Sequence, residues 1–151
     1  MALFLAVSLL VIIPPVSADN DINNATPLTN GVSTNGYVCY DDGCSPNDEI
    51  DWWKIYAYKG DIVQVGFSGS MNNGAWWCVD DGWEADFSLH DSGGSQIASQ
   101  AMSDSGSSTT LSTTMPTAGW VNVKIKGKDS WCNDGVDYTL TPSLNQDNRD
   151  S

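Results

Sequence analysis

Basic side chains are scarce in this sequence. Six Lys or Arg stand against nineteen Asp or Glu in 151 residues, so the formal net charge is −13. Because such a chain repels phosphates, we expect neither nucleic acid nor an anionic lipid surface as a partner. The shortage does not indicate disorder, since 40% of the residues are hydrophobic and seven are Trp.

Helical periodicity is also missing. Short runs of alternating polar and apolar residues are separated by turn sequences, and they cover roughly 36–40, 51–58, 61–68, 85–90, 95–101, 108–114, 119–126 and 136–142. About eight strands in one domain predict an all-β fold, an antiparallel β-sandwich of jelly-roll type. The turn Lys59–Asp61 predicts a hairpin over 51–68, and Asp91–Gly94 predicts another that joins 85–90 to 95–101.

Alternation within the runs predicts the core. The inward faces comprise Trp53, Ile55 and Ala57, then Val63, Val65 and Phe67, then Val121, Val123 and Ile125. The opposite faces carry Lys54, Asn122, Lys124 and Lys126 together with an aromatic row, Trp52, Tyr56, Tyr58 and Trp120. An exposed aromatic row is typical of an interface, including one between copies of the chain. The alternative is that the N-terminal segment or a long loop covers it.

The first eighteen residues contain no charge. An apolar run over 2–13 is followed by two prolines and by Val16-Ser17-Ala18. This pattern predicts a signal peptide over 1–18, and therefore a secreted, extracellular or cell-surface protein with no membrane span after cleavage. Since no Lys or Arg precedes the run, an uncleaved anchor is the alternative. We expect 19–35 to be an extended lead-in, 36–144 the sandwich and 145–151 a flexible tail.

The four cysteines do not have the spacing of a zinc site, because no Cys-x-x-Cys pair occurs and His90 is the only His. An even number of cysteines in an exported chain predicts disulfides. Of the three pairings that four cysteines allow, we expect Cys39 with Cys44 around a turn sequence, and Cys78 with Cys132.

Signatures of catalysis are not found. The sequence contains no Gly-x-Ser-x-Gly, and His90 lies at the end of a run, where we expect a solvated strand residue. We expect no enzyme. The alternative is a hydrolase built on His90 or on paired carboxylates.

Four segments in order resemble the bacterial and archaeal pre-peptidase C-terminal (PPC) domain, a family that includes the collagen-binding domains of clostridial collagenases. They are Asn20–Leu28, Asp48–Ile55 (DEIDWWKI) with the Gly60–Asp61 turn, Asp86–Leu89 with Gly93–Ser95, and Ala118–Ile125 (AGWVNVKI) with Tyr138–Leu140. The resemblance implies a jelly-roll-like sandwich without catalytic activity, which in some members binds calcium or insoluble matrix. We expect two departures from the family pattern, namely the lack of an attached peptidase and a long, Trp-rich loop over 69–84.

The resemblance also implies a calcium site that ties the N-terminal segment to the strand beginning near residue 51. Carried over by position, its ligands would be Asn20, Asp21, Asp48 and Asp51. Asp48 and Asp51 are three residues apart, so both can face one ion, and closely spaced carboxylates and amides suit calcium. The alternative is that Asp21 caps a turn and Asp51 accepts from backbone amides.

Aromatic and acidic residues form a second candidate site. Trp76, Trp77, Asp80, Asp81 and Trp83 lie in one loop, and Trp131 and Asp134 lie in another. A Cys78–Cys132 disulfide would join the two loops. Flat rings beside carboxylates suit a sugar, and also a peptide or a cationic group. The alternatives are a minor core packed over the disulfide and a second calcium site at Asp80, Asp81 and Asp134.

Together these features predict a secreted, non-catalytic binding or adhesion domain, calcium-stabilised, that recognises extracellular polysaccharide or a protein matrix. A second interpretation is a structural subunit of a cell-surface or extracellular assembly, which would self-associate. A third is an unrecognised hydrolase.

Overall fold

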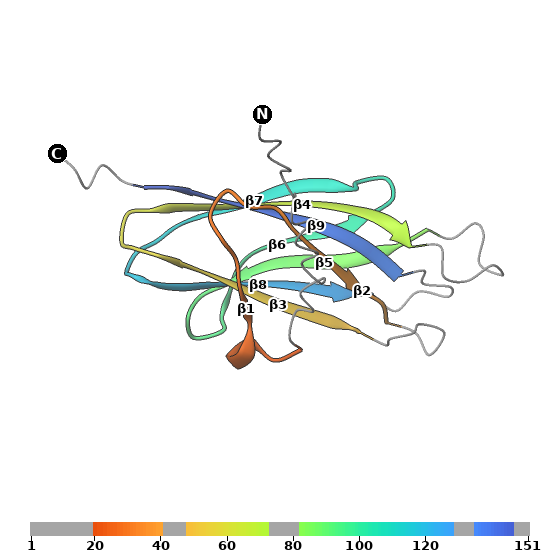
Figure 1. Ribbon diagram of the computed structural model, residues 1–151, viewed down its shortest axis with the longest axis horizontal. Coiled ribbons are helices and arrows are strands. Elements are labelled where there is room, and N and C mark those ends of the chain that lie inside the picture. Colours follow the sequence, from red (N-terminus) through yellow and green to blue (C-terminus); the bar gives the residue numbers. More distant parts are fainter. Residues whose placement is uncertain (1–19, 41–47, 73–81, 129–134, 147–151) are drawn as a thin grey trace, which may run out of the picture.

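The structure is a computed structural model and describes residues 20–40, 48–72, 82–128 and 135–146 (Figure 1). One 3-10 turn, η1 (Ile22–Asn24), precedes the strands of the domain. The strands are β1 (Thr26–Pro27), β2 (Thr34–Val38), β3 (Ile50–Ala57), β4 (Ile62–Asn72), β5 (Glu84–His90), β6 (Gln96–Ser103), β7 (Ser108–Thr114), β8 (Gly119–Gly127) and β9 (Gly135–Asn145). The predicted all-β class is therefore confirmed.

Two sheets face each other and form a sandwich (Figure 1). One has five strands in the order β1-β3-β8-β5-β6, and the other has four in the order β2-β9-β4-β7. Every pair of neighbouring strands is antiparallel except β1 with β3. The predicted runs match β2 to β9 closely. The lead-in is less uniform than expected, since it contains η1, β1 and the start of β2.

The predicted hairpin over 51–68 is wrong. β3 pairs with β1 and β8, whereas β4 pairs with β7 and β9, so the turn between them carries the chain from one sheet to the other. Their pairing partners place β3 and β4 in opposite layers, and both strands bury alternate side chains in the core between the layers. The backbone N–H of Tyr58 donates to Asp61 Oδ2 at 2.9 Å and stabilises this turn. The second predicted hairpin, β5 with β6, is confirmed.

The core lies between the sheets and contains the side chains that alternation predicts. Those of β3, β4 and β8 are all buried, namely Trp53, Ile55, Ala57, Val63, Val65, Phe67, Val121, Val123 and Ile125. Phe67 of the four-stranded sheet stacks on Phe87 of the five-stranded sheet, with ring centroids 5.4 Å apart. Burial of a large apolar side chain contributes about 1.5–3 kcal/mol, so these contacts hold the layers together.

No helix within the described ranges has the length and hydropathy needed to cross a membrane. The predicted signal peptide over 1–18 lies outside the described residues, as do residues 147–151 of the predicted tail. Asn145, which the sequence assigned to the tail, is the last residue of β9.

Candidate functional site

Asp51, near the start of β3, is a buried carboxylate with one unsatisfied oxygen. The residue is 1% exposed. Its Oδ2 accepts a hydrogen bond from the hydroxyl of Tyr138, and that hydroxyl accepts one from Trp53 Nε1 at 2.8 Å. Among the residues that the structure describes, Oδ1 has no hydrogen-bond partner. A buried polar atom left without a partner costs about 1–3 kcal/mol, so this oxygen would gain from a cation or a proton.

The surroundings of Asp48 and Asp51, called the N-terminal junction below, disfavour the negative charge of both carboxylates. Burial raises the pKa of Asp51 to about 7, and the nearby Asp48 carboxylate adds to the rise. Hydrogen bonds from Tyr138 and from the Tyr37 backbone lower this pKa, but by less. Burial also raises the pKa of Asp48. The pKa of Tyr138 is raised well above its usual range by burial and by Asp51. Two desolvated carboxyls at one place are the arrangement that a cation stabilises most.

Asn20 brings the N-terminal segment to the same place. Its side-chain amide lies against Asp48 Oδ1, at 2.8 Å, and against the carbonyl oxygen of Ile50. In one orientation the amide nitrogen donates to both oxygens. In the other orientation the amide oxygen of Asn20 faces Asp48 Oδ1 and the Ile50 carbonyl oxygen, so three oxygens from separate residues converge near the start of β3.

Asp21 takes part in a turn. It is the N-cap of η1, and its Oδ1 accepts hydrogen bonds from the backbone and side-chain nitrogens of Asn23, both at 2.9 Å. Among the described residues, no group of three His, Cys, Asp or Glu side chains could hold a metal. A cation at this junction would therefore need the Asn20 amide and the Ile50 carbonyl beside Asp48 and Asp51.

A second surface lies on the outer face of the five-stranded sheet. Tyr58, Tyr56 and Trp120 are 53%, 42% and 39% exposed. The rings of Tyr56 and Trp120 meet edge to face at 5.2 Å, as do those of Tyr56 and Tyr58 at 5.3 Å. Trp52 lies on the same face of β3 and pairs with Lys124 of β8. Three residues of the predicted aromatic row, Tyr56, Tyr58 and Trp120, are thus exposed, whereas Trp52 is half-buried.

Comparison with known proteins places the fold. No family model matches the chain, and no curated protein does. A crystal structure of the pre-peptidase C-terminal domain of collagenase from Bacillus anthracis matches with 13% identity and a TM-score of 0.52, over 87% of this chain and 98% of that one. The chain has a PPC-like fold. Aeromonas hydrophila PliG, a periplasmic lysozyme inhibitor of g-type lysozyme, matches with 14% identity and a TM-score of 0.51, over 80% and 95%.

In this PPC-like domain His90 is buried rather than solvated, so the sequence expectation for it is wrong. It is 8% exposed, and its ring lies edge-on to Trp52 at 5.0 Å. Its Nδ1 contacts the carbonyl of Gly94 at 3.0 Å, and its Nε2 contacts Ser88 Oγ at 3.0 Å. Since a carbonyl can only accept, Nδ1 carries the proton and Ser88 donates to Nε2. Ser88 is itself 4% exposed, so its hydroxyl does not face solvent as a nucleophile would.

Of the residues predicted for the Trp-rich site, the structure describes only Trp83. The predicted loop over 69–84 is shorter than expected, because residues 69–72 belong to β4 and Glu84 begins β5. The side chain of Trp83 is 3% exposed and packs in the core of the PPC-like domain, 6.2 Å from Phe67 between ring centroids. Its position matches the packing alternative. The other residues of this predicted site lie outside the described residues, namely Trp76, Trp77, Asp80, Asp81, Trp131 and Asp134.

The predicted disulfides are described only at Cys39. It is buried and disulfide-bonded. Cys44, Cys78 and Cys132 lie outside the described residues, so the pairing stays a prediction.

Proposed function

We propose that this chain is a secreted, non-catalytic binding or adhesion module that recognises an extracellular polysaccharide or protein. The observation that carries the proposal is the exposed aromatic row formed by Tyr58, Tyr56 and Trp120. Large apolar side chains gathered on one face are typical of an interaction site. Two similar structures are a lysozyme inhibitor and a pre-peptidase C-terminal domain, which supports a role without catalysis. The apolar leader and the even number of cysteines support export.

Retention on insoluble ligands tests this function. Residues 19–151 are incubated with a panel of insoluble polysaccharides and with collagen, and the bound fraction is measured by sedimentation. Trp120→Ala should lose most of the retention. Val32→Ala, which removes an exposed apolar side chain elsewhere, is the matched control and should bind as the unaltered chain does. Absence of retention on the whole panel would contradict the proposal.

The same aromatic row would also serve the second candidate function, a structural subunit. Copies of the chain would then meet through this face. Sedimentation velocity over a range of protein concentrations separates the two functions. A monomer at all concentrations favours the binding module, and an oligomer that Trp120→Ala dissociates favours the subunit.

Calcium is proposed to stabilise the module at the N-terminal junction. Asp48, Asp51, the Asn20 amide and the Ile50 carbonyl offer the hard oxygen ligands that calcium prefers. The observation that favours a cation here is Asp51 Oδ1, which has no hydrogen-bond partner within the described part of the chain. Asp21 belongs to the proposed set through the family resemblance. A bound ion would neutralise the buried carboxylates and join the N-terminal segment to β3.

Thermal unfolding in excess EDTA and then in millimolar calcium tests the ion. A site with a dissociation constant of about 10⁻⁴ M adds roughly 2.7 kcal/mol at 10 mM calcium, which moves the midpoint by several degrees. Asp51→Asn should abolish the shift. Glu49→Gln removes an exposed charge beside the junction and should retain it. A midpoint that calcium does not move would overturn the calcium proposal.

A further inference from the structure

The few basic side chains of this chain gather on its aromatic face. Lys54 of β3 and Lys124 and Lys126 of β8 alternate with Trp52, Tyr56 and Trp120 along the paired strands. Lys128 follows β8 directly, so four of the six basic residues lie on these two strands or at their end. In a chain with a net charge of −13, this face has locally the opposite sign.

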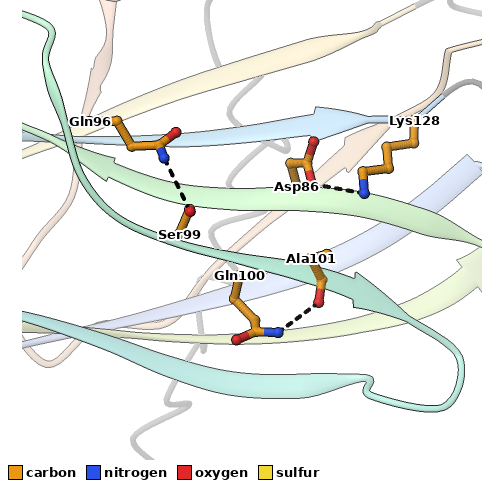
Figure 2. Close-up of polar contacts among 6 residues, drawn as sticks. All are labelled: Asp86, Gln96, Ser99, Gln100, Ala101 and Lys128. Carbon is orange, nitrogen blue, oxygen red and sulfur yellow. Dashed lines mark hydrogen bonds and ion pairs between the residues drawn. The ribbon is translucent and has the colours of Figure 1, made fainter.

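Within the strands of this sheet, the outward acidic side chains lie at the start of β5, and Asp91 follows β5 at its other end. Asp86 of β5 forms an ion pair with Lys128, with Nζ and Oδ1 3.1 Å apart (Figure 2). Glu84 begins the same strand. β6, at the border of the sheet, carries no charged residue, and its Gln96 donates to Ser99 (Figure 2). Towards the other end, neither Lys54 nor Lys124 makes an ion pair with any residue that the structure describes.

Each of these two lysines lies over a tryptophan. Lys54 Nζ is 5.2 Å from the ring centroid of Trp120, and Lys124 Nζ is 5.2 Å from that of Trp52. The face therefore repeats one unit twice, an aromatic ring with an ammonium beside it. Burial lowers the pKa of Lys124, and the neighbouring charge of Lys126 lowers it further, whereas Asp86 raises it. An anion placed at Lys124 would relieve this cost.

The two units are far enough apart to require an extended ligand. Trp52 pairs with Lys124, which lies four residues from Trp120 on β8, so the backbone positions of the two tryptophans are about 13 Å apart along the strands. Beside Trp120 a shallow hollow of about 330 Å³ is lined by Lys54, Asn122, Ser92 and Asn23, among others. A chain molecule lying along β3 and β8 would contact both units, whereas a small solute would contact one.

The outer face of the other sheet shows that this arrangement is not general to the sandwich. Its exposed positions on β4, β7 and β9 are short and mostly hydroxylated, and they include Gln64, Ser68, Thr110, Ser112, Thr141 and Ser143. The sequences of its four strands contain neither Lys nor Trp. Aromatic rings and positive charge are thus concentrated together on the five-stranded sheet alone.

We infer that the outer face of the five-stranded sheet binds an acidic polysaccharide, a polymer whose sugars bear carboxylates or sulfates. This inference rests on the proposed binding function and names its ligand class. The Trp and Tyr rings would pack against the apolar faces of sugar rings, and Lys54 and Lys124 would pair with the acid groups. An acidic peptide fits less well, because extended peptides bind sheets by adding a strand at an edge, and these residues lie on a face.

Matched polymers test the ligand class. Binding of residues 19–151 to polygalacturonate, dextran sulfate, neutral dextran and polyglutamate is measured by isothermal titration calorimetry at low and at physiological salt. We expect the affinity for the two acidic polysaccharides to exceed that for dextran at least tenfold and to fall as salt rises. Binding of one but not the other identifies the acid as carboxylate or sulfate.

Two lysine variants and a control identify the surface. Lys54→Gln and Lys124→Gln should each weaken binding to the acidic polysaccharide several-fold. Lys59→Gln removes the same charge from the turn after β3 and should leave the affinity unchanged. Thermal midpoints within a few degrees of the unaltered chain show that each variant is folded. Equal weakening by all three would overturn the assignment to this face.

The outcomes separate this inference from the proposed function. Retention on neutral polysaccharide or collagen, without affinity for acidic polysaccharides, overturns the inference and leaves a binding module. Equal affinity for polyglutamate assigns the face to acidic peptides instead and also overturns it. If no polymer and no matrix is bound at all, both the inference and the proposed function fail.

Discussion

Tyr138 of β9 donates its hydroxyl hydrogen bond to Asp51 of β3, from one sheet of the sandwich to the other. Because the same hydroxyl accepts from Trp53 Nε1, the three residues form a continuous polar chain inside the core. This chain ends at the junction where Asn20 and Asp48 meet. Whatever neutralises Asp51 therefore also affects how the two sheets are held together.

The raised pKa of Asp51 predicts an unusual pH dependence in the absence of calcium. Its pKa is about 7 in the folded protein and about 3.9 in an unfolded chain. Between these values the folded protein keeps a proton that the unfolded chain has lost, so the free energy of unfolding should fall as the pH rises from 4 to 7, by up to about 4 kcal/mol. Urea unfolding in EDTA at several pH values measures this fall.

Two comparisons test whether Asp51 causes this fall in the free energy of unfolding. Asp51→Asn should flatten the pH dependence over the same range, because the neutral amide has no proton to lose. Saturating calcium should flatten it as well if the ion binds the ionised carboxylate. A free energy of unfolding that rises with pH in EDTA would show that other carboxyls dominate.

Removal of the Tyr138 hydroxyl should destabilise the protein without leaving a large cavity. In Tyr138→Phe, Asp51 loses a donor and Trp53 Nε1 loses its acceptor, both in buried positions. We expect a loss of about 1.5–3 kcal/mol in the free energy of unfolding. Tyr56→Phe removes an exposed hydroxyl and should change it by less than about 0.5 kcal/mol. Equal effects of the two variants would show that the buried chain contributes nothing.

Gly36 provides the space that the Tyr138 ring occupies. The two residues pair across β2 and β9, and a Cβ at Gly36 would overlap the hydroxyl and the ring of Tyr138. Gly36→Ala should therefore cost about 1–3 kcal/mol, since the ring must move away from Asp51. Gly106→Ala meets no atom within 4 Å and is the control. Denaturant midpoints of both variants measure the difference, and an unaffected Gly36→Ala would contradict the packing.

The Ser88–His90 contact should support the fold and not a reaction. Ser88→Ala leaves His90 Nε2 buried without its donor, so we expect a loss of about 1–3 kcal/mol. Ser99→Ala, on the neighbouring strand and exposed, should be nearly neutral. An esterase assay with a chromogenic ester should show no turnover by the unaltered chain. Turnover that Ser88→Ala removes would restore the hydrolase interpretation.

Alternation along the strands was sufficient to predict the core. Trp53, Val65 and Val123 are buried because a period of two places every second side chain on one face, which is a property of each strand alone. Which strands pair within a sheet, in contrast, is not a property of one strand alone. The turn sequence Lys59-Gly60-Asp61 is compatible with a hairpin and with a crossing between sheets, and pairing with distant β8 and β9 decides between them.

For the same reason, the sequence predicted some residues of the candidate site and missed others. The family resemblance led to Asn20, Asp48 and Asp51, which the fold brings to one junction. The roles of Tyr138 and Trp53 were missed, because Tyr138 lies 87 residues from Asp51 and nothing in the intervening sequence links them. The lysine and tryptophan pairs were also missed. Alternation placed Lys124 and Trp52 on outer faces, but only the register of β3 with β8 brings them together.

The edge of the five-stranded sheet formed by β1 bears on how the chain behaves at high concentration. This strand is two residues long and ends at Pro27, which has no N–H to offer a further strand. Short strands and prolines at sheet edges prevent the growth of continuous intermolecular sheets. Strand addition at β1 is thus disfavoured, and copies that extended this sheet into a fibre would have to pair elsewhere.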